Sequence, residues 1–169
     1  MELIGRWLTA AELREVLDDP DAVEVLLFGD DGDEDDDEVG EMPEPDLDLG
    51  KSWHVVQFLF TGTAWGVTEG LGEAILGGAD IGEDGGYGPA RLLDAATVTR
   101  VATALDALDV ETLRSRFDPA AMSAAEIYPE GWDFSPADFE EIVRPLIGDL
   151  RAFYRKAAAR GQAVLLAIA

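Results

Sequence analysis

The chain of 169 residues contains no cysteine. Disulfides, thiol catalysis and zinc-thiolate sites are therefore excluded, and the composition fits a reducing compartment. No run approaches the roughly 18 apolar residues that a membrane-spanning helix needs, and Glu2 and Arg6 interrupt the short apolar start at residues 1–9. We expect a cytoplasmic protein with no membrane segment.

Basic residues are scarce. The chain has 12 Lys and Arg against 36 Asp and Glu, which gives a formal net charge of −24. Duplex nucleic acid is bound through clustered Lys and Arg that displace counterions, and a strongly negative field repels phosphate. We therefore predict no nucleic-acid partner and favour a basic protein. Because Arg-rich, Lys-poor and Ala-rich usage also reflects coding bias, charge alone does not establish a partner.

The length suits one domain, large enough to bury roughly 70% of the surface that the unfolded chain exposes. We predict a single domain over residues 1–169, with an acidic mobile loop at 30–50. This stretch holds twelve acids and no base, so it has too little apolar surface to offset the entropy of ordering. A calcium loop does not fit, because counting from Asp31 puts Asp36 at the glycine position and Met42 at the closing position.

Caps followed by apolar residues at three- and four-residue steps predict helices over 10–17, 20–28, 53–60, 95–108, 110–116, 119–125 and 136–160. Pro145 should kink the last helix, because proline removes an interior donor. Strands are expected at residues 90–93 and 162–169, and the second is apolar enough to be covered on both faces. The fold class is therefore α/β in the mixed α+β sense.

The segment Ile81–Arg91 has four glycines and a proline between two helix-forming regions. Glycine permits positive φ and proline fixes its own φ, so we expect a loop of defined course. Its polar side chains would be presented together: Glu83, Asp84, Tyr87 and Arg91. A phosphate-binding loop is excluded, because the required lysine is missing and the carboxylates oppose an anion.

Glu83 and Asp84 are candidate catalytic carboxylates. With Asp118, Glu126 or Asp133 they could alternatively supply oxygen ligands to a divalent cation. The simpler interpretation is a solvated turn in a very acidic protein, and we predict no metal site and no cofactor.

His54 is the third catalytic candidate, since it is the only side chain whose unperturbed pKa lies near neutrality. The alternative is a structural histidine whose ring bonds a nearby carboxylate or the backbone. Ser52, beside it, is better explained as a helix cap than as a nucleophile, because no Gly-x-Ser-x-Gly turn surrounds it.

Several further residues are candidate binding residues. Arg91 either pairs bidentately with Glu83, Asp84 or Asp118 and organises the loop, or binds a substrate. Tyr128-Pro129 and Trp132-Asp133 form an aromatic turn that either anchors a partner or packs in the core. The complete binding set is Tyr87, Arg91, Asp118, Glu126, Tyr128, Trp132 and Asp133.

Several blocks in fixed order resemble the bacterial YfbM-like family, a domain of unknown function. They are Lys51-Ser52-Trp53-His54, Gly62, Ile81–Arg91, Phe117–Met122, Ala125–Pro129 with Trp132-Asp133, and Phe153–Ala169. The resemblance runs from Ile4-Gly5 to the end of the chain. It implies a cytoplasmic single-domain protein with helices packed around a small central sheet, and no established activity. The acidic stretch Asp30–Glu41 is longer than we expect of the family.

Two function hypotheses follow. The first is a non-catalytic acidic interaction protein, for instance an inhibitor or immunity-type protein that masks a basic partner. The second is a small hydrolase or metal-assisted enzyme whose cleft is formed by His54, Glu83, Asp84, Tyr87, Arg91, Asp118 and Tyr128. We lean to the first and leave catalysis and the oligomeric state open.

Overall fold

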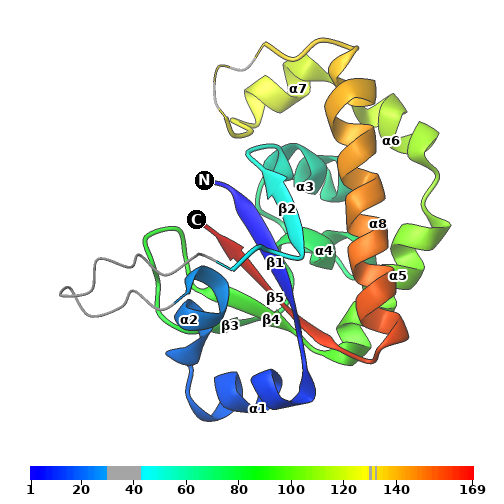
Figure 1. Cartoon of the computed structure of the whole chain (residues 1–169). Helices are drawn as coiled ribbons and strands as arrows, with labels where there is room; N and C mark the ends of the chain where they lie inside the picture. The colour runs from blue at the N-terminus through cyan, green and yellow to red at the C-terminus, as the bar shows by residue number, and fades with distance from the viewer. Residues whose placement is uncertain (30–42, 130, 132) are drawn as a thin grey trace.

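A five-stranded antiparallel sheet forms the centre of the protein. The computed structural model describes residues 1–29, 43–129, 131 and 133–169. The strand order is β2-β1-β5-β4-β3. The strands are β1 (Leu3–Leu8), β2 (Leu47–Gly50), β3 (Ala79–Ile81), β4 (Ala90–Leu93) and β5 (Ala163–Ile168). Figure 1 shows the sheet between two groups of helices, so the mixed α/β class is confirmed.

One group of helices is small and consists of α1 (Ala10–Asp18) and α2 (Ala22–Phe28). The other group covers the opposite face and extends beyond it (Figure 1). It contains α3 (Trp53–Thr61), α4 (Glu73–Leu76), α5 (Ala95–Ala107), α6 (Val110–Arg116), α7 (Pro119–Ala124) and α8 (Arg144–Ala159). A short 3-10 turn (Gly70–Gly72) leads into α4.

The central strand β5 shows how the two layers share the sheet. Its residues alternate between two apolar cores, because successive side chains of a strand point to opposite faces. Val164 and Leu166 belong to the larger core with α3, α5 and α8. Ala163, Leu165 and Ala167 belong to the smaller core beneath α1 and α2. The prediction of a terminal strand covered on both faces is confirmed.

Local capping explains several helix starts. In α1, the Thr9 side chain accepts from the Glu12 amide while the Glu12 carboxylate accepts from the Thr9 amide, which is the predicted capping box. Asp94, Asp109 and Asp118 likewise accept backbone amides at the starts of α5, α6 and α7. These side chains satisfy amides that have no partner inside their helix.

The predicted extent of the acidic loop needs correction. The acidic loop was expected to continue to residue 50, but Leu47–Gly50 forms β2 and pairs antiparallel with β1. The alternation of buried and exposed side chains explains why this segment is a strand, because Leu47 and Leu49 face the core while Asp48 is exposed. The rest of the predicted loop, residues 30–42, lies outside the described residues.

The predicted long helix from residue 136 to residue 160 is present with one irregularity. A π-helical turn (Phe139–Val143) runs without a break into α8, because Val143 and Arg144 both have right-handed helical backbone angles and the Arg144 amide donates to the Phe139 carbonyl. Pro145, which has no N–H to donate, directly follows this turn. The irregularity therefore falls where the proline signal indicated, and it takes the form of a π-helical turn.

Candidate functional site

The glycine segment is the connection of the β3–β4 hairpin. The Asp84 carboxylate accepts the amides of Gly86 and Gly88 at 2.7 and 2.9 Å, which closes the loop on itself. Gly82, Gly86 and Gly88 have φ of +77°, +107° and +92°, values that side-chain-bearing residues rarely adopt. The predicted defined course therefore depends on Asp84, the glycines and the strand pairing.

This loop lies beside α2. A Cβ added to Gly82 would lie 3.3 Å from the Cβ of Val23 and 3.4 Å from the Pro20 carbonyl oxygen. The position thus combines a positive φ with a close approach, and only glycine meets both conditions without strain.

Arg91 has a different partner from the one predicted. Its Nη1 lies 3.2 Å from the Asp80 carboxylate, and the two residues stand opposite each other in the β3–β4 ladder. The antiparallel register brings Asp80 to Arg91, which replaces the predicted bidentate pair with Glu83, Asp84 or Asp118.

His54 is buried inside the molecule. It is 1% exposed and stacks on Trp53 with ring centroids 4.7 Å apart. The Tyr128 amide donates to Nδ1 at 3.0 Å, so Nδ1 is unprotonated. Nε2, 2.9 Å from the Ala64 carbonyl oxygen, must then carry the proton and donate. Both ring nitrogens of this neutral imidazole are engaged with backbone, which favours the structural interpretation of His54.

Burial lowers the pKa of His54 from its ordinary value near 6.5, and the hydrogen bond to Ala64 opposes that shift. The ring therefore stays neutral over a wider range of pH than a free histidine. Its two hydrogen bonds join α3 to the backbone at Ala64 and at Tyr128.

A second buried polar side chain of α3 reaches the same turn. The Gln57 amide donates to the Gly66 carbonyl at 2.6 Å, and the Gly66 amide donates to the Thr63 hydroxyl at 2.9 Å. His54 and Gln57 thus hold the carbonyl groups on both sides of Trp65. The Trp65 indole is nevertheless 60% exposed.

Two hollows flank the glycine loop, and Tyr87 lines both. The first, which we call the acidic groove, has a volume of about 680 Å³. Its charged lining residues are Asp21, Glu24, Glu83 and Asp84, with no Lys or Arg among the described lining residues. Its apolar residues come from α2, β4 and the end of β5: Val23, Leu27, Phe28, Ala90, Ala167 and Ile168.

The second, which we call the aromatic hollow, has a volume of about 230 Å³. Arg91 is its single charged residue within the described part of the chain. The other lining residues are Leu3, Trp65, Val67, Ile75, Leu76, Tyr87, Pro89, Leu166, Ala167 and Ile168. The two hollows therefore differ in the sign of their charge.

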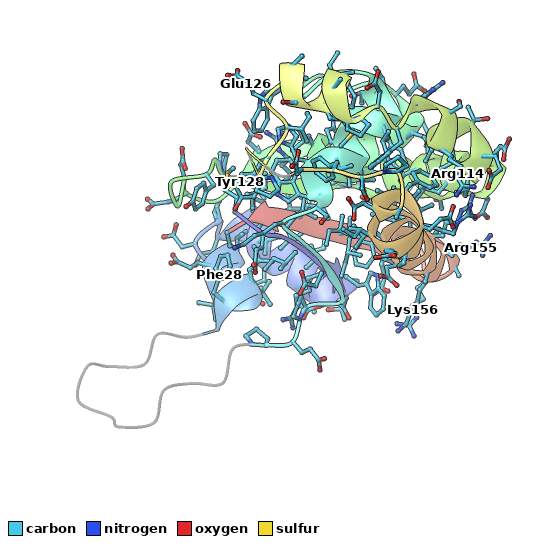
Figure 2. All side chains as sticks on the ribbon, turned by 90° about the horizontal axis from the view of Figure 1, so that it is seen from above. Phe28, Arg114, Glu126, Tyr128, Arg155 and Lys156 are labelled. Carbon is cyan, nitrogen blue, oxygen red and sulfur yellow. The ribbon has the colours of Figure 1, made fainter. Side chains whose placement is uncertain are left out.

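The remaining predicted site residues do not join one cleft. Asp118 caps α7 and lines a separate surface hollow with Phe58 and Arg116. Tyr128 supplies its amide to His54, and its hydroxyl lies 3.3 Å from the Met1 nitrogen. Figure 2 shows Glu126 at the far side of the molecule from Phe28 of the acidic groove, with Tyr128 between them.

Asp133 is exposed, and Trp132 lies outside the described residues. Among the residues that the structure describes, no group of three or more His, Cys, Asp or Glu side chains is arranged to hold a metal ion. In the same part of the chain, no helix has the length and apolar character needed to cross a membrane.

Sequence reasoning missed Trp65, Val67, Asp21 and Glu24 as lining residues. For Trp65 a signal was present: large apolar residues at 65 and 67 stand among threonines and glycines, outside any periodic element. The two acids of α2 carried no such signal, because exposed acids are common throughout this chain.

The architecture defines a mixed α/β protein with two hollows beside its glycine loop. Residues 1–167 match the family described as "Domain of unknown function (DUF1877)", and the chain belongs to that family, which confirms the resemblance to YfbM-like proteins. A solved structure described as a protein of unknown function, YfbM from Escherichia coli, is similar over 98% of both chains, with a TM-score of 0.73 and 22% identity. That likeness establishes the fold. No curated protein is significantly similar to the chain.

Proposed function

We propose that this protein is a non-catalytic binding protein whose acidic groove takes a basic, partly apolar segment of another protein. The observation that carries the proposal is the composition of the groove. Carboxylates at the start of α2 (Asp21, Glu24) and of the glycine loop (Glu83, Asp84) line the same groove together with apolar side chains. Such a surface complements Lys or Arg side chains at its rim and an apolar side chain at its floor.

The distribution of charge over the molecule also favours the approach of a basic partner to the acidic groove. Seven of the 12 basic residues lie on α5, α6 and α8. Figure 2 shows three of them, Arg114, Arg155 and Lys156, on the side of the molecule away from Phe28 of α2. A basic partner is therefore attracted toward the α2 side by the whole-molecule field as well as by the groove.

Many of these cations are already paired. Arg144 donates to Glu140 and Glu111, and Arg155 pairs with Asp106. Since the bases neutralise acids near α5, α6 and α8, the unpaired negative charge is concentrated elsewhere. An inhibitor or immunity-type role, in which the groove masks a basic surface, is one form that this function takes.

The enzyme hypothesis has weaker support. It needs His54 as a proton-transfer group beside the glycine loop, but both ring nitrogens are bonded to backbone and the ring is buried. A general base must reach the proton that it removes. Asp84, the second candidate, is already used to shape the loop.

The test is a titration with a short synthetic peptide of alternating Lys and Leu, in which binding is measured by calorimetry at low salt. The groove variant carries Asp21→Asn, Glu24→Gln and Glu83→Gln, and leaves Asp84 intact because Asp84 shapes the loop. We expect its affinity to fall at least about tenfold, which corresponds to about 1.4 kcal/mol. Binding of the unmodified protein should also weaken as salt is raised.

A matched control removes the same charge from exposed acids elsewhere: Glu126→Gln, Asp133→Asn and Glu141→Gln. Its affinity should stay within about twofold of the unmodified protein. Equal losses in the two variants would show attraction by net charge alone, and absence of saturable binding would show no site. Either result contradicts the proposal.

A further inference from the structure

The aromatic hollow gathers most of the exposed large apolar side chains. Five such residues are found in the described part of the chain, and three of them, Trp65, Val67 and Tyr87, line this one hollow at 60%, 50% and 55% exposure. Scattered exposed apolar residues need no explanation, but a contiguous set around a concavity indicates a binding site.

The tryptophan of this hollow is held in place before any ligand arrives. The preceding carbonyl, of Ala64, accepts from His54, and the following one, of Gly66, accepts from Gln57. The indole also packs against the His54 ring, with centroids 4.5 Å apart. Two of the few buried polar side chains therefore serve a turn whose central residue is exposed. Fixing a recognition side chain in advance reduces the entropy lost on binding.

The hollow has one cationic group. Arg91 makes a single ion-pair contact with the exposed Asp80 and no other hydrogen bond or ion pair of its side chain within the described residues. By contrast, Arg100 binds Glu73 through two nitrogens, and Arg151 donates to two carbonyl oxygens. A guanidinium has five N–H donors arranged for a carboxylate, so Arg91 retains donors for an incoming anion.

We propose that the aromatic hollow binds a small aromatic monocarboxylate, with the ring against Trp65 and Tyr87 and the carboxylate on Arg91. The positive charge of Arg91 favours an anionic aromatic ligand over a cationic one, because a cation would be repelled by Arg91 in an apolar surrounding. The volume of about 230 Å³ is below the roughly 300 Å³ at which drug-sized ligand pockets begin, which suits a ligand of one or two rings. This site adjoins the acidic groove and shares Tyr87, Ala167 and Ile168 with it, but the inference does not depend on the proposed function.

The experiment titrates the full chain with indole-3-acetate. Binding is measured by calorimetry and by the NMR resonance of the Trp65 indole N–H. Indole-3-acetamide, the neutral analogue, is the matched ligand. The variants are Trp65→Ala and Arg91→Gln; Tyr87 is left unchanged because it also lines the acidic groove. The control variants are Arg14→Gln, whose side chain bonds only its own helix, and Leu17→Ala, another exposed apolar residue.

We expect saturable binding of the carboxylate and a loss of at least about tenfold for Arg91→Gln, for Trp65→Ala and for the amide analogue. The two control variants should bind within about twofold of the unmodified protein. Three results overturn the proposal: no saturable binding at millimolar probe, equal binding of acid and amide, or an affinity unchanged by both hollow variants. Circular dichroism of each variant verifies that the fold is retained.

Discussion

The imidazole of His54 and the indole of Trp65 have ring centroids 4.5 Å apart, although His54 is 1% exposed and Trp65 is 60% exposed. The pair connects the interior of α3 with the surface of the aromatic hollow. The hydrogen bond between His54 and the Ala64 carbonyl therefore joins a buried ring to the backbone beside an exposed aromatic side chain.

The first prediction concerns the pH dependence of stability. Burial lowers the pKa of His54 in the folded protein, so below about 6.5 the unfolded chain binds the proton that the folded ring does not. The contribution of His54 is therefore complete above pH 6.5 and declines as the pH falls toward the lower folded pKa. Its slope can reach about 1.4 kcal/mol per pH unit. Urea unfolding at several pH values measures it.

The control is His54→Gln, which does not titrate and retains one donor and one acceptor. Subtracting its pH profile removes the contribution of the carboxylates and of the changing net charge, which both proteins share. Parallel profiles between about pH 6.5 and pH 5.5 would contradict the assignment of a neutral buried His54.

The second prediction concerns Gln57→Leu. Gln57 donates to the Gly66 carbonyl, but its own Oε1 is buried without a hydrogen-bond partner among the described residues. Because the substitution removes one hydrogen bond and one unsatisfied acceptor together, we expect global stability to change by less than about 1 kcal/mol.

The turn at Thr63–Gly66 should be affected more than the whole molecule. Amide exchange of Gly66 and acrylamide quenching of Trp65 should both increase in the Gln57→Leu variant, because the Gly66 carbonyl has lost its hydrogen bond to α3. Unchanged exchange and quenching would show that Gln57 does not hold the turn.

The third prediction concerns Tyr154→Phe. The Tyr154 ring is 0% exposed, and its hydroxyl donates to the Ala74 carbonyl at 2.8 Å, which links α8 to α4. Removing the hydroxyl leaves a buried carbonyl without that donor, so unfolding should become easier by about 1–3 kcal/mol. Tyr128→Phe is the control, because the Tyr128 hydroxyl is only partly buried. Similar urea midpoints for both variants would contradict this account.

The fourth prediction concerns Asp84→Ala. The Asp84 carboxylate accepts two loop amides, so its loss should speed amide exchange at Gly86 and Gly88. Because the loop is exposed, the melting temperature should change little. Glu83→Ala, next to it, makes no such bonds in the described structure and should leave exchange unchanged. Equal effects of the two substitutions would mean that Asp84 does not organise the loop.

Much of the fold could be predicted because its signals are local. Thr9 with Glu12, and Asp94, Asp109 and Asp118, lie within a few residues of the amides that they cap. The apolar run Gln162–Ala169 likewise carried its own evidence of burial on both faces. Strand β2 was missed because two leucines alternating with acids are hidden in an acidic composition.

The candidate site was harder to predict because it depends on pairings across the chain. Asp80 meets Arg91 only through the register of the β3–β4 hairpin, and α2 meets the glycine loop only in three dimensions. The glycine loop itself was predicted from its own residues. Its neighbours were not, since no local pattern shows that Asp21 and Glu24 line the same groove as Glu83.

The most direct test of the account is an amide NMR titration of one labelled sample with two probes, the Lys-Leu peptide and indole-3-acetate. If the glycine loop separates two sites of opposite charge, the peptide shifts resonances of α2 and of Glu83–Gly88, while indole-3-acetate shifts the Trp65 indole and Arg91. Tyr87 lines both hollows and should respond to both probes. Shifts of Asp21 and Glu24 by indole-3-acetate, shifts of Trp65 and Arg91 by the peptide, or shifts in neither hollow would contradict the account.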